Sequence, residues 1–335
     1  MTSTVKSFLR DLTGVFLISS LLASSGYAQT WTLPQVGAPD GEVQVLHVKG
    51  SVYMVAGSGG NIAVQVGSDG VLMVDTGSGE LTDKVLAAVE TLSDQPVRYI
   101  VNTSYPMDYT GGNAAIAAAG GLPTPFRGSG SRSVQGQFGA DKASVISYYT
   151  VFHQMAAPAD ESLMREDGAW PDNTFSTPLK RLYFNDEPVV IMHQPSTTDG
   201  NSIVLFRKSD VIVAGAVLNI ETYPVIEVDA GGSIQSVIAS LNALIDLAVP
   251  AGRSEGGTLV IPGRGRISDF AELAQHRDMM AIIRDRVQHL ISEGMSLREV
   301  LEARPTYGFD DRYGSDSGDW TTDMFVEAVY RGLAD

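Results

Sequence analysis

The side chains best placed to do chemistry stand in one short segment, residues 102–113, whose sequence is NTSYPMDYTGGN. It holds one carboxylate, Asp108, beside the phenol of Tyr109 and the hydroxyl of Ser104. A zinc site needs imidazole, thiolate or carboxylate donors, and neutral hydroxyl and phenol groups are poor ligands. The segment therefore offers charge and hydrogen bonds but few groups that would hold zinc.

The sequence around this segment predicts where it lies. An apolar run at residues 97–101 precedes it and indicates a buried strand. Gly111 and Gly112 end it, and an alanine-rich stretch typical of a helix follows. We therefore expect the segment to form the loop between a strand and a helix.

Four other segments also lie at the ends of predicted strands. Residues 75–77 (DTG) follow a strand pair expected at residues 61–66 and 71–75. The others are residues 195–202 (PSTTDGNS), 213–216 (VAGA) and 261–265 (IPGRG). Each segment alone is weak evidence for a particular fold, because glycine-rich junctions between strands and loops are common. The occurrence of all five segments in this order is specific evidence.

Together the five segments resemble the strand-end motifs of the metallo-β-lactamase superfamily, over roughly residues 43–268. The resemblance implies an α/β fold, the four-layered αββα sandwich, and hydrolysis by a zinc-activated hydroxide. Residues 102–113 fall on the family pattern T-H-x-H-x-D-H-x-G-G-N, in which Asp108 is the ligand that remains. The other ligand positions of the family are held here by Ser104, Pro106, Tyr109, Thr197, Ala216 and Arg264.

These substitutions predict a protein with no zinc cofactor, although zinc is expected for the family. In its place we expect a ligand-binding cleft formed by Asp75, Ser104, Asp108, Tyr109, Thr197, Asp199 and Arg264. In an alternative interpretation, Asp75, Asp108 and Asp199 hold a hard cation such as calcium or magnesium, which prefers oxygen ligands. Asp75 and Asp199 could instead cap loop amides, as aspartates often do.

Arg264 suggests how such a cleft is built. Without a cation, a partly buried Asp108 would lack a partner, and an unpaired buried charge is costly. A guanidinium can replace the cation and bond a carboxylate through its N–H groups. We therefore expect Arg264 within hydrogen-bonding reach of Asp108, with a solvent-facing arginine as the alternative. If the pair is buried, losing Arg264 should cost roughly 3–5 kcal/mol.

A catalytic interpretation needs a nucleophile and a base. Ser104 and Ser196 are available, but serine without a base is a weak nucleophile. None of the five histidines is predictably beside either serine, although His193 lies just before one site motif. The catalytic residues are therefore unknown. Asp108, Tyr109 and Arg264 are the candidates, because such a cluster could bind an anion or polarise a carbonyl.

Composition narrows the range of partners and compartments. The net charge of −16 argues against nucleic acid and anionic lipid as partners. The absence of cysteine excludes disulfides and thiolate sites. Residues 1–28 combine a basic start, an apolar run too short to cross a bilayer, and Gly-Tyr-Ala, which is typical of a secretory signal. An uncleaved anchor or a disordered tail is the alternative.

The patterns also predict the organisation of the chain. We expect the sandwich domain over residues 40–268 and a helical extension packed on it over residues 269–335. Helices are predicted over residues 81–92, 141–155 and 236–248. Residues 157–178 are expected to be a long surface excursion. Asp269 with Glu272, and Ser296 with Glu299, indicate capping boxes at two C-terminal helices.

The favoured function is that of a bacterial protein, periplasmic or secreted and without a membrane span once the signal is cleaved. It would be a pseudoenzyme relative of the hydrolases, non-catalytic or metal-independent, that binds a small molecule or a protein partner in the former active-site cleft. The alternative is a hydrolase of the ester, lactone or lactam type with an atypical site. An enzyme should lose turnover when Asp108 or Arg264 is changed, whereas a binding module has none to lose.

Overall fold

The structure is a computed structural model that describes residues 41–123, 142–157, 164–165, 167–254 and 256–334. The predicted signal at residues 1–28 lies outside this part of the chain. Among the described residues, no helix is both long enough and apolar enough to cross a membrane.

The N-terminal half contributes a mixed sheet in the order β1-β2-β3-β4-β5-β6-β7. Neighbours are antiparallel from β1 to β4 and parallel from β4 to β7. The strands are β1 (Gln44–Lys49), β2 (Val52–Ala56), β3 (Ile62–Gly67), β4 (Gly70–Val74), β5 (Val97–Asn102), β6 (Ser144–Tyr148) and β7 (Asn173–Phe175). Every residue of β4 is buried, as expected for a central strand covered on both faces.

A second sheet follows in the order β12-β11-β10-β9-β8. Its pairs are antiparallel except β11 with β12, which is parallel. The strands are β8 (Leu179–Phe184), β9 (Glu187–His193), β10 (Ser202–Phe206), β11 (Val211–Asn219) and β12 (Leu259–Arg264). The connection from β11 to β12 runs through η3 (Val228–Ala230) and α5 (Ile234–Leu247).

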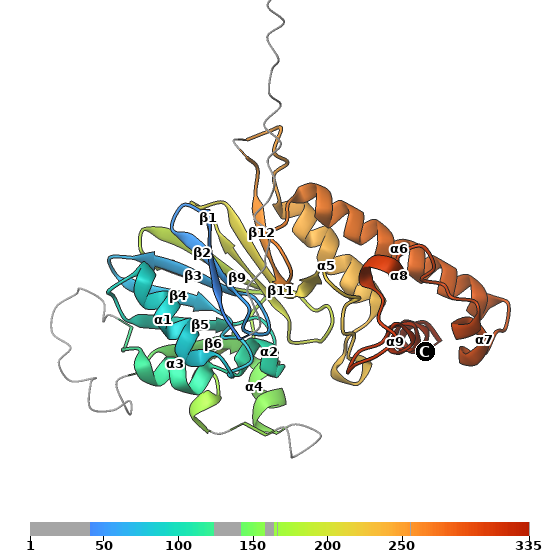
Figure 1. Cartoon of the computed structure of the whole chain (residues 1–335), viewed down its shortest axis with the longest axis horizontal. Coiled ribbons are helices and arrows are strands. Elements are labelled where there is room, and N and C mark those ends of the chain that lie inside the picture. Colours follow the sequence, from blue (N-terminus) through green and yellow to red (C-terminus); the bar gives the residue numbers. More distant parts are fainter. Residues whose placement is uncertain (1–40, 124–141, 158–163, 166, 255, 335) are drawn as a thin grey trace, which may run out of the picture. The chain divides into compact units, whose positions relative to one another are not determined.

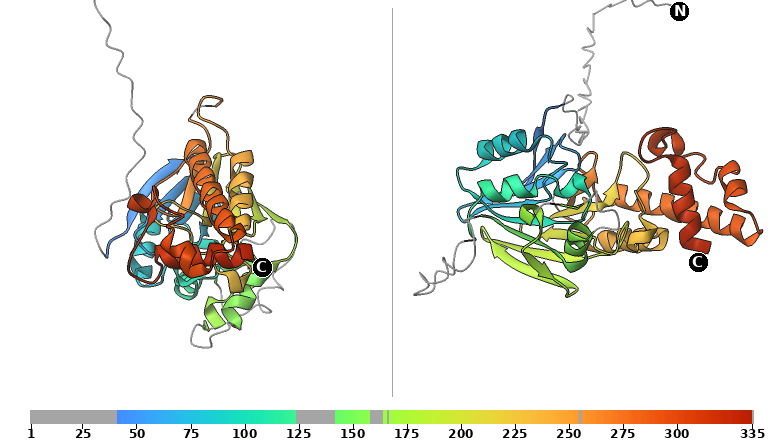
Figure 2. Two further views of the ribbon diagram at one scale, coloured as in Figure 1. Left: turned by 90° about the vertical axis from the view of Figure 1, so that its right-hand side faces the viewer. Right: turned by 90° about the horizontal axis from the view of Figure 1, so that it is seen from below.

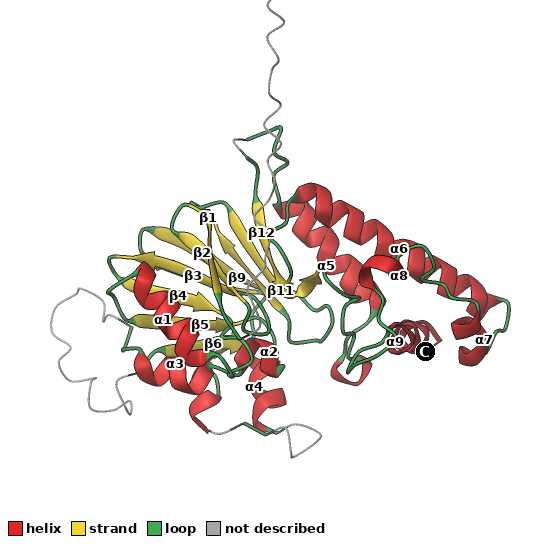
Figure 3. Ribbon diagram, viewed as in Figure 1, coloured by secondary structure: helices red, strands yellow, loops and turns green. Residues whose placement is uncertain are grey.

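Helices cover the outer faces of both sheets (Figures 1 and 3). On the first sheet, α1 (Thr82–Leu92) and α3 (Asn113–Ala119) bury Val85, Val89 and Ile116 in one cluster with Met73 and Ile100. A separate cluster fills the space between the sheets and includes Met54, Ile146, Phe206 and Ile261. These layers confirm the predicted αββα sandwich.

The outer face of the second sheet is covered by α5 and the C-terminal helices, which share one hydrophobic cluster. These helices are α6 (Phe270–Ser292), α7 (Leu297–Glu302), α8 (Asp310–Tyr313) and α9 (Thr322–Ala334). They gather at one end of the fold (Figure 2). All the residues that the structure describes belong to one compact unit.

The helix caps follow the sequence closely. Ser296 and Glu299 form the predicted capping box at α7. At α6 the side chain of Asp269 accepts from the backbone N–H groups of Ala271 and Glu272. The carboxylate of Glu272 instead bonds Arg266, with 2.9 Å between Oε2 and Nη1, so the reciprocal half of that box is replaced by an ion pair.

Two predictions between residues 141 and 178 were only partly right in the described residues. The helix expected over residues 141–155 is a strand, β6, followed by a shorter helix, α4 (Tyr149–Ala156). The sequence SVISY forms a strand because it pairs with β5 on one side and with β7 on the other. Its β-branched residues suit this buried position in a sheet. The expected surface excursion likewise includes β7, which forms the edge of the first sheet, and η2 (Asp167–Ala169).

Candidate functional site

A cavity of about 130 Å³ opens where the ends of β5, β11 and β12 meet the loop between β9 and β10. It is lined by Ser104, Pro106, Asp108, Tyr109, Thr197, Ala216, Asn219, Val225, Glu227 and Arg264. Five of the seven predicted ligand-binding residues are in this set. The lining also includes all six residues that stand where the predicted family pattern has other ligands: Ser104, Pro106, Tyr109, Thr197, Ala216 and Arg264.

The short helix α2 (Met107–Thr110) presents Asp108 and Tyr109 to the cavity. Its backbone is fixed to two neighbouring loops. The N–H of Gly60 donates to the carbonyl of Asp108 at 3.1 Å, and the N–H of Thr76 donates to the carbonyl of Tyr109 at 2.9 Å. The loop is held further by Gly111, whose N–H donates to the carbonyl of Gly77 at 2.9 Å.

Asn61 fixes the loop that carries Arg264, and sequence reasoning missed this role. Its side-chain Nδ2 donates to the carbonyls of Pro262 at 3.0 Å and Gly265 at 2.7 Å. Its backbone N–H donates to the carbonyl of Gly263 at 2.7 Å. Asn61 is 4% exposed, so these bonds are made in the interior. The only sign of this role in the sequence was the position of Asn61, a polar residue at the start of an apolar strand.

Arg264 donates a hydrogen bond through Nη2 to Oδ2 of Asp108, which confirms the expected contact. Burial lowers the pKa of Arg264, but the bond to Asp108 and the charges of Asp108, Tyr109 and Glu221 outweigh it, so the pKa is raised. The guanidinium therefore stays charged. The condition set for the larger stability loss, a buried pair, is not met, since the two side chains are 36% and 39% exposed.

This exposure lowers the expected contribution of the pair, because water screens charges that it can reach. We expect Arg264→Ala and Asp108→Ala each to lower the free energy of unfolding by about 1 kcal/mol or less, in place of the 3–5 kcal/mol expected for a buried pair. The double variant should lose less than the sum of the single losses, because the two residues interact. Urea unfolding of all four proteins measures this.

The exposed helical pair Arg298–Glu302 serves as the control cycle, with 3.3 Å between Nε and Oε1. Its side chains are 84% and 66% exposed, so we expect weaker coupling than for Arg264 and Asp108. Strict additivity at Arg264 and Asp108 would contradict the interaction.

Asn201 connects two of the predicted site residues. Its Nδ2 donates to Oγ of Ser104 at 3.0 Å, and its Oδ1 accepts from Oγ1 of Thr197 at 3.0 Å. Ser104 and Asn201 are fully buried, and Thr197 is 4% exposed. The two hydroxyls are therefore held rigidly at the cavity wall by a residue that sequence reasoning did not select.

Glu227 is the second acidic residue of the cavity lining, in addition to Asp108. The sequence analysis did not select it. It lies in the loop between β11 and η3, and its Oε2 accepts a hydrogen bond from the hydroxyl of Tyr105. Burial raises the pKa of Glu227, and the bond from Tyr105 lowers it by less. Burial also raises the pKa of Tyr105, with the bond to Glu227 adding to that shift. No motif marks this residue, because its loop meets the cavity only in the folded chain.

Tyr109 is 8% exposed and lines the same cavity as Arg264 and Asp108. Burial raises the pKa of its phenol, and the nearby carboxylates of Asp75 and Asp108 raise it further against the opposing charge of Arg264. The phenol is therefore neutral near pH 7 and acts as a hydrogen-bonding group.

Asp75 and Asp199 were assigned to the ligand-binding set, and the structure places neither in the cavity lining. Asp75 is fully buried; its Oδ1 accepts from the N–H of Thr103 at 2.7 Å and its Oδ2 from the hydroxyl at 2.6 Å. Asp199 accepts from Nε2 of Gln154 at 3.3 Å. Both carboxylates support loops.

The hard-cation alternative also fails on this geometry. Within the described residues, no group of three or more histidine, aspartate or glutamate side chains lies close enough together to hold a metal ion. Asp75, Asp108 and Asp199 are therefore not brought to a common point.

The serine and histidine candidates have structural roles. The hydroxyl of Ser196 is buried and accepts from Oγ of Ser240 at 2.8 Å, away from the cavity lining. The ring of His193 stacks on Tyr148 at 3.5 Å between centroids, and its Nε2 lies 2.7 Å from the carbonyl of Asp199. None of the five histidines lines the cavity, so neither Ser104 nor Ser196 has an imidazole base there.

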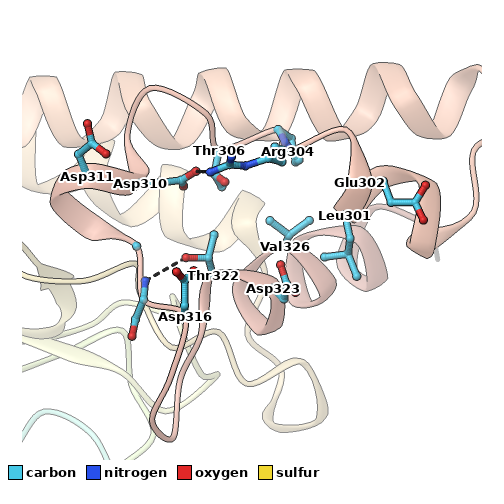
Figure 4. Close-up of a pocket in the computed structure, with 13 residues that line it drawn as sticks. Leu301, Glu302, Arg304, Thr306, Asp310, Asp311, Asp316, Thr322, Asp323 and Val326 are labelled. Carbon is cyan, nitrogen blue, oxygen red and sulfur yellow. Dashed lines mark hydrogen bonds and ion pairs between the residues drawn. The ribbon is translucent and has the colours of Figure 1, made fainter.

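Another cavity, of about 570 Å³, lies in the C-terminal extension between α7, α8 and α9 (Figure 4). Its walls are acidic and include Glu302, Asp311 and Asp323. Asp310 in the same wall already accepts from the hydroxyl of Tyr223 at 3.0 Å and from Nη2 of Arg304 at 3.3 Å. No residue of the strand-end loops reaches this cavity, so it is separate from the candidate site.

Comparison with known proteins identifies the class. The model of the family described as the metallo-beta-lactamase superfamily matches residues 55–252, more than half of the chain. The chain therefore belongs to the metallo-β-lactamase superfamily. Among curated proteins, sequence comparison finds no match.

Solved structures show the same fold at low sequence identity. A metallo-β-lactamase from Pontibacter korlensis has a TM-score of 0.52 at 17% identity, covering 72% of this chain and 99% of that one. A stereoselective inverting sec-alkylsulfatase from Pseudomonas sp. has a TM-score of 0.60 at 14% identity, covering 86% of this chain. This chain spans only 50% of the sulfatase.

Proposed function

We propose that this protein is a metal-independent, non-catalytic relative of the superfamily hydrolases that binds a small ligand in the cavity around Arg264. The observation that carries the proposal is the ion pair between Arg264 and Asp108. It puts a fixed positive charge beside the one carboxylate that matches the family's zinc-ligand pattern. A guanidinium so placed supplies, from within the chain, the charge compensation that a metal supplies elsewhere.

The chemistry of the lining supports this proposal because it does not fit zinc. Zinc sites use three or four imidazole, thiolate or carboxylate ligands. The lining offers two carboxylates, Asp108 and Glu227, and each already accepts a side-chain hydrogen bond. The phenol of Tyr109 is neutral near pH 7, since its ordinary pKa is 10.0 and burial raises it further. The positive charge of Arg264 would also repel a zinc ion in this cavity.

The absence of an imidazole base beside the cavity hydroxyls supports a non-catalytic role. Ser104 is held by Asn201, and no histidine lines the cavity. Serine without a base is a weak nucleophile. A binding role needs none of these groups to react, only to keep their positions, and the buried network of Asn61 and Asn201 does this.

Hydrolysis assays test the proposal. We expect the untagged protein to show no chelator-sensitive turnover of a β-lactam, a lactone, a thioester or a secondary alkyl sulfate. A zinc-dependent β-lactamase assayed in parallel provides the positive control. Turnover that disappears with EDTA and returns with zinc would overturn the proposal.

The same assays separate the hydrolase alternative from the binding function. Turnover that survives EDTA and is lost in Asp108→Asn or Arg264→Gln would establish an enzyme with an atypical site. Equal turnover in these variants would point to a contaminating activity, because both residues line the cavity.

We also propose that the protein acts in the periplasm or outside the cell. The proposal rests on the signal-like composition of residues 1–28, which lie outside the described residues. Fractionation of a bacterium that expresses the full chain tests it, with the mature protein expected outside the cytoplasm.

A further inference from the structure

The cavity around Arg264 contains donors that the described part of the chain does not use. Arg264 donates one N–H group to Asp108. Its other N–H groups have no side-chain or backbone acceptor among the described residues. The hydroxyl of Tyr109 makes no hydrogen bond to the described residues, and Ser104 accepts from Asn201 but donates to none of them. These groups can receive a carboxylate, which a guanidinium recognises through paired N–H groups.

The same cavity contains unused acceptors. Glu227 accepts at Oε2 from Tyr105, and its Oε1 has no donor within the described part of the chain. Asp108 accepts from Arg264 at Oδ2, and its Oδ1 is likewise without a donor there. Carboxylate oxygens of this kind bind ammonium groups, which carry only donors.

The formal charge of the lining decides which ligands are favoured. Asp108 and Glu227 contribute −2 and Arg264 contributes +1, so the cavity carries a net charge of −1. Glu221 adds a further negative charge near Arg264. A simple anion would be repelled by these carboxylates, because like charges at close range are unfavourable. A simple cation would leave the N–H groups of Arg264 unmatched.

The size of the cavity sets a second limit. Its volume of about 130 Å³ is well below the roughly 300–1,000 Å³ of cavities that enclose drug-sized ligands. That space admits a head group with one carboxylate and one ammonium, with anything larger extending outward. Val225 lies in the lining and is 43% exposed, so an extension would pass an apolar rim.

From these observations we propose that the cavity binds the head group of a small zwitterion, a compound with one ammonium and one carboxylate such as a short amino acid. The carboxylate accepts from Arg264 and Tyr109, and the ammonium donates to Glu227. This inference rests on the proposed binding function and specifies its ligand class.

Calorimetric titration of the full chain with four probes at equal ionic strength tests the inference. Glycine and β-alanine are the zwitterions, whereas acetate and ethylammonium each carry one of the two charges. We expect one of the zwitterions to bind at least about tenfold more tightly than either single-charge compound. Equal binding of acetate or of ethylammonium would overturn the inference, and so would the absence of binding by both zwitterions.

A matched pair of variants locates the ammonium contact. Glu227→Gln keeps the shape of the side chain and removes its charge, so we expect a loss of at least about tenfold in zwitterion affinity. Glu221→Gln makes the same charge change at a residue outside the lining and should alter the affinity by less than about threefold. Equal losses would mean that the effect is general electrostatics and that Glu227 makes no contact.

Tyr109→Phe gives an independent test if Glu227→Gln does not fold. It removes one proposed donor to the carboxylate, so zwitterion affinity should fall while thermal unfolding still shows a folded protein. Unchanged affinity would contradict the proposed pose. Chelator-sensitive turnover would refute the proposed function whatever these titrations give, whereas missing zwitterion binding without turnover refutes only the ligand class.

Discussion

Gly111→Ala is expected to destabilise the protein by roughly 3 kcal/mol, because the added methyl group has no space. A Cβ at this position would lie 2.0 Å from the carbonyl oxygen of Ser78 and 2.8 Å from the backbone nitrogen of Gly79. These are backbone atoms, so relief requires two loops to separate. That movement would also displace α2, which carries Asp108 and Tyr109. Urea unfolding followed by circular dichroism measures the loss.

Gly252→Ala is the matched control, because a Cβ there meets no atom within 4 Å. Its effect should stay within about 0.5 kcal/mol. If Gly111→Ala proved as stable as this control, the close approach of the two loops would be wrong, and with it the fixed position of Asp108.

Asp75 should make stability fall as pH rises from about 4 to about 7. Burial raises the pKa of Asp75 from 3.8 to about 7, against the opposing hydrogen bonds from Thr103. Between these values the folded state binds a proton that the unfolded state has released. The stabilisation is therefore complete below pH 3.8 and is lost as pH rises through 7, by about 1.4 kcal/mol per pH unit.

Asp75→Asn isolates this contribution. The amide oxygen can accept from the N–H of Thr103, and the amide nitrogen can donate to the Thr103 hydroxyl, so both contacts survive. Asparagine also tolerates the left-handed backbone at this position, where φ is 63°. Unfolding free energies at pH 5 and pH 8 should show that wild type loses stability relative to the variant. Parallel profiles would contradict the raised pKa.

The fold was largely readable from the sequence because its motifs sit where strands end. Glycine-rich junctions after apolar runs predicted the loops at residues 102–113 and 261–265, and these loops do border one cavity. Residues 144–148 were mistaken for helix because a short apolar run has the same composition in a buried strand. Pairing with β5 and β7 decided the outcome, and a local pattern does not contain that information.

The site was predicted where it follows from motif positions and missed where it depends on tertiary contacts. Ser104, Asp108 and Arg264 were found through their places in strand-end loops. Asp75 looked like a site carboxylate, but its depth and its bonds to Thr103 appear only in the folded chain. Glu227 was overlooked because its loop carries no motif and reaches the cavity from 119 positions after Asp108 in the sequence.

The metal content of the purified protein tests the central claim most directly. The untagged chain would be dialysed against zinc, then against zinc-free buffer, and its bound zinc measured by elemental analysis. With Arg264 paired to Asp108, we predict far less than one zinc ion per chain, and the same for Asp108→Asn. Stoichiometric zinc that remains after dialysis and is lost in Asp108→Asn would contradict the account.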